Sequence, residues 1–273
     1  MPVDGPSLMA SYEGYEALRF ERHGDVLEAT IDRPGSELNA IDGTLHSELA
    51  RLFRELRRER GARAVLLTGS KKAFSAGGDF DWFPTLDSVA RLDHLRLDAR
   101  QLIWDLVDIE LPVVAALNGP AVGLGASVAL LCDVIVMADT AVVADPHVKV
   151  GVVAGDGGAA IWPLLVGPAR AKQYLLTGDP LTADEAERIG LVNEVVPVAD
   201  VLERGRWWAS RLAAGAPMAV RATKVAVNAQ VKRALLESFD LSTSLELMTF
   251  LSEDHKEALA ALKERRPPEF RGR

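Results

Sequence analysis

Apolar and polar positions alternate with two different periods along the first 200 residues. Residues 17–22 and 26–32 predict the two strands of a hairpin around a turn at residues 23–25. After Asp42, which can cap a helix, apolar side chains recur at i, i+4, i+7, i+8 and i+11. This spacing predicts an amphipathic helix whose core-facing residues are Leu45, Leu49, Leu52, Phe53 and Leu56.

Further short apolar runs predict buried strands, and they lie at residues 64–68, 113–117, 134–138 and 141–144. A second helix is expected through residues 92–106. The stretch 113–132 carries no formal charge and is about as long as a membrane helix requires. Asn118-Gly119-Pro120 interrupts it with residues typical of a turn. We therefore expect a buried strand, a glycine turn and a short helix near residues 125–131.

From about residue 200 onward the pattern predicts helices only, with breaks at Gly215 and Pro217. Strand-like and helix-like segments alternate before that point. The expected fold class is therefore α/β, with a core at residues 1–199 and a helical C-terminal region at residues 200–273.

Composition narrows the possible partners of this 273-residue chain. A net charge of -8 argues against nucleic acid and anionic membranes as partners, because both attract clusters of cations. Cys132 is the only cysteine, so no internal disulfide can form, and a buried thiol is expected. The opening residues 1–10 show no basic region followed by an apolar stretch, so no signal peptide is expected and the predicted location is cytoplasmic.

Two glycine-rich turns carry the candidate chemistry, and each is expected between a strand and a helix. They are Phe74-Ser75-Ala76-Gly77-Gly78-Asp79 and Asn118-Gly119-Pro120-Ala121-Val122-Gly123-Leu124-Gly125. Such turns leave backbone N–H groups unpaired, and two that face each other can bind an oxyanion. The alternative is that the glycines only permit tight turns. Neither turn has the spacing of a dinucleotide-binding loop or the Gly-Lys-Ser/Thr of a P-loop.

The order of motifs resembles the crotonase (enoyl-CoA hydratase/isomerase) superfamily over nearly the whole chain. The segments that resemble it are Thr30-Ile31-Asp32-Arg33-Pro34, Leu38-Asn39-Ala40, both glycine turns, Cys132-Asp133, Leu175-Leu176-Thr177-Gly178, Ala183-Asp184-Glu185-Ala186 and Gly190-Leu191-Val192-Asn193-Glu194-Val195-Val196-Pro197.

The resemblance implies a spiral of ββα units with a helical trimerisation region, assembled as a homotrimer or hexamer. It implies an acyl-CoA substrate whose carbonyl oxygen lies between two backbone N–H groups, which by position belong to Ala76 and Leu124. Coenzyme A would be part of the substrate, and no separate cofactor is expected. Other residues expected near the substrate are Arg33, Lys72, Phe74, Gly77, Gly78, Gly123 and Ser127.

The departures from the family pattern concern the acid and base groups. Hydratases of this family use two glutamates, and the matching positions here hold Ser127 and His147. Nine residues after His147 comes Asp156, and a carboxylate beside imidazole suits a general base. This pair is similar to that of the β-diketone hydrolase branch, represented by 6-oxocamphor hydrolase. The alternative is a partly buried loop histidine and an aspartate that caps the next helix.

The remaining histidines are expected at the surface: His23, His46, His94 and His255. None of them forms a cluster with metal-ligand spacing, so no metal site is expected. Asp79 is expected to cap a helix after the first glycine turn. Three functions stay open: an acyl-CoA enzyme of hydratase/isomerase type with altered acid/base residues, a carbon–carbon hydrolase of β-diketones, and a non-catalytic acyl-CoA-binding protein.

Overall fold

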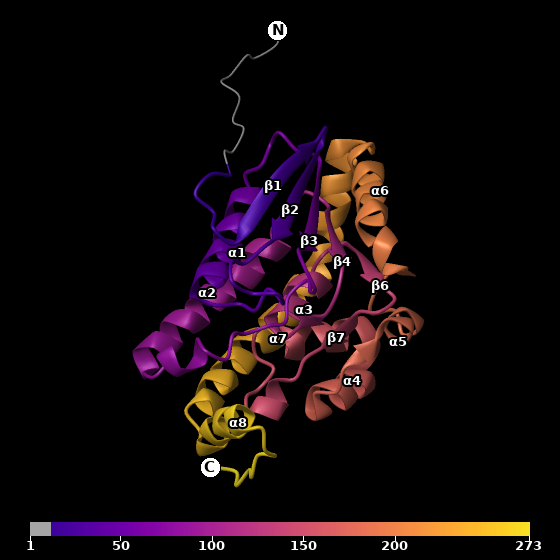
Figure 1. Cartoon of the computed structure of the whole chain (residues 1–273). Helices are drawn as coiled ribbons and strands as arrows, with labels where there is room; N and C mark the ends of the chain where they lie inside the picture. Colours follow the sequence, from indigo (N-terminus) through magenta and orange to yellow (C-terminus); the bar gives the residue numbers. More distant parts are fainter. Residues whose placement is uncertain (1–11) are drawn as a thin grey trace.

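The computed structural model describes residues 12–273, and a six-stranded sheet forms its upper half in Figure 1. The strand order is β1-β2-β3-β4-β6-β9. The strands are β1 (Leu18–His23), β2 (Val26–Ile31), β3 (Ala64–Gly69), β4 (Val113–Leu117), β6 (Val134–Ala138) and β9 (Glu194–Val196). The first two form the predicted antiparallel hairpin, with Leu18 opposite Ile31, and all other neighbours are parallel. Because β4 is buried along its whole length, it is an uninterrupted apolar run.

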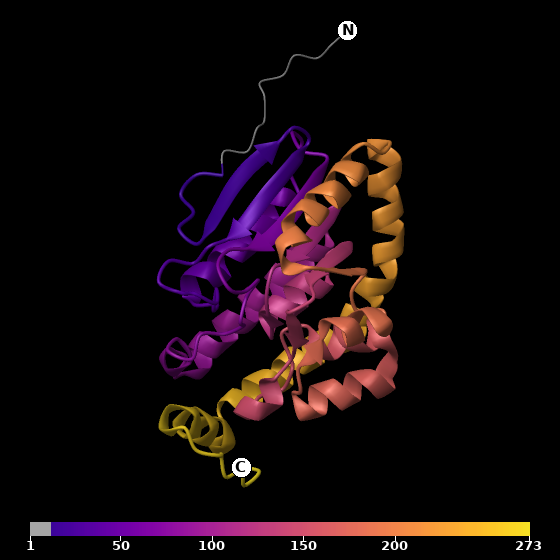
Figure 2. The ribbon, with the colours of Figure 1, turned by 45° about the vertical axis from the view of Figure 1, so that its right-hand side comes forward.

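Three helices pack near this sheet. In α1 (Gly43–Leu56), Asp42 accepts a hydrogen bond from the Leu45 N–H at 2.9 Å, as predicted, and the five apolar residues of the predicted face are buried. The helix α2 (Val89–Val107) packs on α1, and α6 (Val201–Ala213) lies against β3, β4 and β6 (Figures 1 and 2). Gly205 of α6 permits this close approach, because an added Cβ would lie 2.9 Å from side-chain atoms of Ala116 and Leu66.

A second, three-stranded sheet lies below the first and carries the loops of the candidate site (Figure 1). Its strands are β5 (Ala121–Val122), β7 (Val142–Ala144) and β8 (Leu181–Thr182), and the helices around it are α3 (Leu124–Leu130), the short 3₁₀ helix η2 (His147–Val150), α4 (Gly158–Thr177) and α5 (Ala183–Arg188). The sequence predicted neither β8 nor β9, because strands of two or three residues leave no periodic pattern.

The long helix α7 (Pro217–Phe250) follows the predicted break and packs on α2 and α4. The last helix, α8 (Glu253–Glu264), contacts η2 and lies near the C-terminus in Figure 2. Two further 3₁₀ turns are η1 (Phe83–Thr85) and η3 (Val198–Asp200). The candidate site lies where α2 and α7 meet the loops of the small sheet.

The first glycine turn differs from expectation, because no helix follows it directly. Only η1 intervenes before α2, and Ser88 caps α2 by accepting a hydrogen bond from the Arg91 N–H. Asp79 instead accepts a hydrogen bond from the Asp81 N–H at 2.9 Å, so the prediction that it caps a helix was wrong.

Within residues 12–273, no helix combines the length and the apolarity needed to cross a membrane. Cys132 is buried, as expected, and burial raises the pKa of its thiol to about 12. The prediction drawn from residues 1–10 lies outside the described residues. The division at residue 200 stays a prediction.

Candidate active site

The two glycine turns pack directly against each other. The Ser75 N–H donates to the Pro120 carbonyl at 3.1 Å, and the Val122 N–H donates to the Ser75 carbonyl at 2.9 Å. An added Cβ at Gly125 would lie 2.7 Å from the Ser75 Cβ, and one at Gly77 would lie 2.8 Å from the Val122 carbonyl oxygen. Glycine at both positions therefore lets the turns approach closely.

The backbone donors of these turns differ from those expected. The Ala76 N–H donates to the Leu38 carbonyl at 2.9 Å, so the assignment of Ala76 as an oxyanion donor was wrong. The N–H groups of Gly78 and Leu124 make no hydrogen bond within residues 12–273, and both residues line one pocket. A pair of free donors on the two facing turns is the arrangement that binds an oxyanion.

This pocket has a volume of about 90 Å³ and joins the turns to a mainly apolar wall from α2 and α7. Apart from Gly78 and Leu124, its lining includes His147, Asp156 and Glu246, with the wall formed by Leu92, Leu95, Ala99, Leu247 and Phe250. Small-ligand sites typically combine an apolar wall with a few convergent polar groups, as here.

His147 lies at the centre of the polar part of the pocket. Its Nδ1 pairs with Asp145, and its Nε2 lies 3.3 Å from Asp156 Oδ2 and 3.8 Å from Glu246 Oε1. Asp156 in turn accepts a hydrogen bond from the Ser127 hydroxyl at 3.1 Å. The structure therefore brings His147 and Asp156 together and adds two carboxyl groups that the sequence analysis did not single out.

The alternative role of Asp156, as a helix cap, was wrong. The N-cap of α4 is Gly157, which has no side chain to accept a hydrogen bond, and Asp156 turns toward His147. The sequence could have pointed to Asp145 as a partner of His147, because it stands two residues before it. No sequence pattern could have linked Glu246 to His147, because it lies about a hundred residues away on α7.

The charges of this cluster shift the pKa values of His147 and Glu246. Burial lowers the pKa of His147, but the negative charges of Asp145 and Asp156 outweigh it and raise the pKa well above its ordinary value. Burial raises the pKa of Glu246, and Asp156 and Asp145 raise it further against the opposing effect of His147, so this pKa also lies well above its ordinary range. The surroundings therefore favour the charged form of His147 and the neutral form of Glu246.

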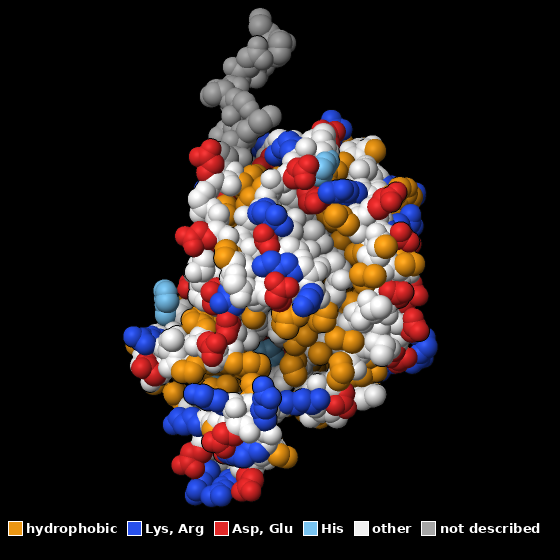
Figure 3. All heavy atoms as spheres, viewed as in Figure 1, with side chains coloured by type: hydrophobic (Ala, Val, Ile, Leu, Met, Phe, Trp, Pro, Cys, Tyr) orange, Lys and Arg blue, Asp and Glu red, His pale blue; other side chains and the backbone are white. Residues whose placement is uncertain are grey.

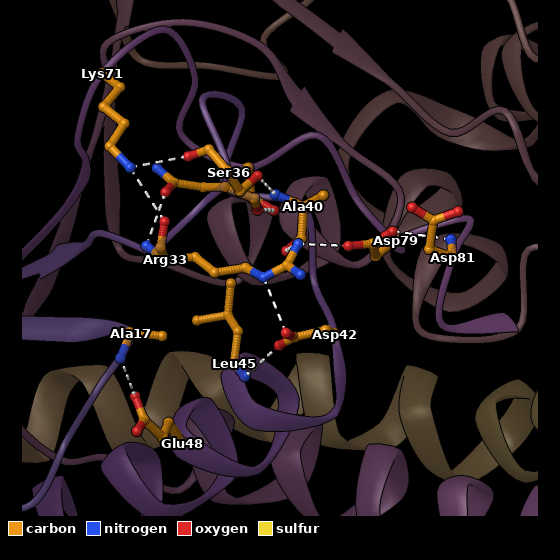
Figure 4. A network of polar contacts seen from close by, with 12 residues as sticks. Ala17, Arg33, Ser36, Ala40, Asp42, Leu45, Glu48, Lys71, Asp79 and Asp81 are labelled. Atoms are coloured by element: carbon orange, nitrogen blue, oxygen red, sulfur yellow. Dashed lines mark hydrogen bonds and ion pairs between the residues drawn. The ribbon is translucent and has the colours of Figure 1, made fainter. Parts of the chain in front are cut away.

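Arg33 braces the loops beside the site and has little freedom to meet a ligand. Its guanidinium donates to Asp42 at 2.9 Å, to Asp79 at 2.5 Å and to the Ala40 carbonyl at 3.0 Å, so that it lies between the two carboxylates (Figure 4). Lys71 bonds the carbonyl groups of Arg33 and Ser36. The expected contact of Arg33 with substrate gains no support from these contacts.

The other residues expected near the substrate have varied positions. Phe74 is fully buried in the core, so its expected contact with a ligand was wrong. Lys72 has 73% of its side chain exposed, at 3.8 Å from Glu37. An added Cβ at Gly123 would lie 3.5 Å from His147 Cε1, so this glycine brings its turn beside the imidazole. Ser127 is buried and holds Asp156.

Two histidines expected at the surface are buried. His46 is 4% exposed and lines the pocket, and burial lowers its pKa. His255 is 4% exposed, and its Nδ1 hydrogen-bonds the Val150 carbonyl of η2 at 2.7 Å. His23 and His94 are exposed, as predicted.

One group in the site could in principle hold a metal ion. Ligand atoms of Asp145, His147 and Asp156 lie within 4.8 Å of one another. Both imidazole nitrogens of His147 already face a carboxylate, however, so a proton on each nitrogen pairs with Asp145 and with Asp156.

Fold and site together define an α/β protein in which two free backbone N–H groups lie in one pocket with a buried cluster of ionisable side chains. Residues 21–273 match the family model described as enoyl-CoA hydratase/isomerase. A probable mitochondrial enoyl-CoA hydratase of Dictyostelium discoideum is 34% identical over 248 residues, which cover 91% of this chain and 88% of the relative.

Two solved structures extend the comparison. An enoyl-CoA hydratase/isomerase from Mycobacterium paratuberculosis has a TM-score of 0.87 at 37% identity, covering 91% of this chain and 99% of the other. A β-diketone hydrolase from the cyanobacterium Anabaena sp. PCC 7120 was solved bound to (S)-3-oxocyclohexyl acetic acid. It has a TM-score of 0.81 at 34% identity, covering 86% of this chain and 94% of the other. The chain belongs to the enoyl-CoA hydratase/isomerase family, which is a family of enzymes.

Proposed function

We propose that this chain is an acyl-CoA enzyme of the hydratase/isomerase type that acts through an enolate. The observation that carries the proposal is the pair of free N–H groups, on Gly78 and Leu124, in the same pocket as His147. Two donors that hold a thioester carbonyl stabilise it most strongly when its oxygen becomes negative, as it does in an enolate. Coenzyme A then enters as part of the substrate, with exposed Lys72 as a candidate contact for its phosphates.

The proton chemistry follows from the buried cluster. His147 exchanges a proton with the α carbon of the acyl group, while Asp145 and Asp156 hold the ring from its two nitrogens. Glu246, protonated beside His147, supplies a second acidic group for a hydroxyl that leaves or a water that adds. In this proposal Glu246 takes the acidic role that the two glutamates have in the family pattern.

A carbon–carbon hydrolase of β-diketones is the second candidate. The pairing of His147 with Asp156 favours it, as does the similarity to a solved β-diketone hydrolase. Cleavage of a cyclic diketone also passes through an enolate, so the same donors and the same imidazole serve both reactions.

Turnover of two substrates distinguishes these functions. Purified protein is incubated separately with crotonyl-CoA and with a cyclic β-diketone, and the products are measured by mass spectrometry. We expect crotonyl-CoA to gain the mass of one water. Ring opening of the diketone alone would favour the hydrolase instead. Binding of acyl-CoA in calorimetry with no conversion of either compound would identify a non-catalytic binding protein.

Replacement of Asp145 by Asn should shift the pH dependence of kcat/KM. Asp145 raises the pKa of His147, so the substitution lowers it, and the limb that requires neutral His147 moves to lower pH. Rates are measured between pH 5 and 10, with Asp179→Asn at the exposed partner of Lys149 as the control. If the pH profile of kcat/KM for Asp145→Asn keeps this limb at the pH found for the unsubstituted chain, the titrating group is not His147.

We also propose a homotrimer or a hexamer, in line with the resemblance. Exposed apolar side chains along α7 support it: Val225, Val227, Leu236, Leu241, Leu245 and Met248. Hydrophobic side chains also gather around a hollow in the lower half of the face in Figure 3. Light scattering should give a mass of three or six chains, and a monomer at micromolar concentration would contradict the assembly.

A further inference from the structure

The segment 147–156 begins with His147 and ends with Asp156, and His147 Nε2 lies 3.3 Å from Asp156 Oδ2. Two different helices hold the two ends of this segment. At the end that carries Asp156, the Ser242 hydroxyl of α7 donates to the Gly155 carbonyl at 3.3 Å. The other end is η2, which α8 contacts. The geometry of the pair therefore depends on where α7 and α8 place the segment.

His255 of α8 is the side chain that fixes η2. Its Nδ1–H donates to the Val150 carbonyl at 2.7 Å, and Val150 stands one 3₁₀ turn after His147. Within residues 12–273, no other group donates to this carbonyl. Gly151 ends η2 and rests on α8, because an added Cβ would lie 2.9 Å from the backbone nitrogen of His255. One hydrogen bond and one close backbone contact thus hold η2 on α8.

The ring of His255 lies behind the pocket. It is 4% exposed, and its centroid lies 4.9 Å from that of Phe250 and 6.1 Å from that of Phe83, two residues that line the pocket. Burial lowers the pKa of His255, whereas the pKa of His147 is raised, so His255 is neutral where His147 titrates. His255 therefore acts on η2 through its hydrogen bond and its packing, and not through a charge.

We propose that His255 is a positioning residue, whose hydrogen bond to the Val150 carbonyl sets the position of η2 and so keeps the imidazole of His147 against Asp156. His255 is not among the residues that line the pocket, so it acts on the substrate only through His147. The effect on turnover rests on the proposed acyl-CoA function. The effect on the pairing of His147 with Asp156 can be measured without any substrate.

His255→Asn and His255→Leu form a matched pair for this test, because the two side chains have the same shape and only Asn carries an N–H donor. The Asn amide nitrogen occupies the same branch position as the histidine Nδ1. The pKa of His147 is measured by NMR titration of protein with labelled histidines, and the signal is assigned by its loss in His147→Ala. In His255→Leu this pKa should fall by at least about 0.5, because the attraction of Asp156 weakens with distance. His255→Asn should keep the pKa of the unsubstituted chain.

The same two variants should differ in turnover of an acyl-CoA ester. Since a displacement of about 1 Å can lower a rate about a hundredfold, we expect kcat to fall at least about tenfold in His255→Leu and to stay within about threefold in His255→Asn. KM should change little in both variants, because the residues that line the pocket are unchanged.

The outcomes separate this inference from the function on which its kinetic part rests. An unchanged pKa of His147 in folded His255→Leu would overturn the inference. Equal changes in the Asn and Leu variants would overturn it as well, because they would assign the effect to lost packing of the ring. If the pKa values differ as expected while the unsubstituted chain turns over no ester, the proposed function fails and the positioning role stands. Circular dichroism checks folding, and if His255→Leu does not fold, His255→Phe fills the space of the ring without a donor and replaces it in the comparison.

Discussion

Replacement of His147 by Ala is expected to lower kcat about a hundred- to ten-thousandfold, the usual contribution of a general acid or base. The imidazole is the group through which Asp145 and Asp156 act, since each faces one of its nitrogens. Steady-state kinetics with the substrate identified by turnover measures the loss. His23→Ala, at an exposed histidine of β1 remote from the pocket lining, is the control and should keep full activity.

The pairing of His147 with Asp156 makes the effects of their substitutions non-additive. Asp156→Asn should lower turnover on its own, and the double variant should be scarcely slower than His147→Ala, because the aspartate acts through the imidazole. Full multiplication of the two losses would mean that the residues work separately. A His147→Ala enzyme with unchanged activity would refute the mechanism and leave the fold untouched.

The second large effect is expected for Leu124→Pro. Leu124 is the first residue of α3, where proline is well tolerated and removes only an N–H that has no partner within the described residues. Loss of one oxyanion donor typically lowers kcat about a hundred- to a thousandfold. The thermal midpoint should change little, and kinetics on the folded variant measures the loss.

Leu124→Ala is the matched control for this substitution. It keeps the N–H and removes most of the side chain, which is 8% exposed and lines the pocket. We expect a modest change in KM and a kcat within about tenfold of the parent. Similar kcat values for the proline and alanine variants would show that this N–H does not bind the developing oxyanion.

Local patterns were sufficient to predict most of the fold. The helix after Asp42 repeats its apolar residues with the helical period and has a polar cap, so sequence neighbours alone define it. The hairpin and the buried strands at β3, β4 and β6 are also local features. Short strands such as β8 depend on partners far along the chain, and the sequence shows no trace of them.

The candidate site was predicted only in part, because it is assembled from distant segments. His147 and Asp156 share one loop region, so their proximity could be inferred, whereas Glu246 reaches them from α7. The position of His46 on α1 suggested a polar face, but α2 and the segment with Trp82 cover it. The bond from Ala76 to Leu38, which leaves the donor role to Gly78, depends on a loop contact that no spacing encodes.

Proton exchange at the α carbon tests the central claim most directly. A saturated ester such as butyryl-CoA is incubated with the protein in D₂O, where removal of an α proton gives the enolate and its return delivers deuterium from solvent. Mass spectrometry should detect deuterium at the α carbon with the unsubstituted chain and exchange at least a hundredfold slower with His147→Ala. Equal exchange rates for the two proteins would contradict the account.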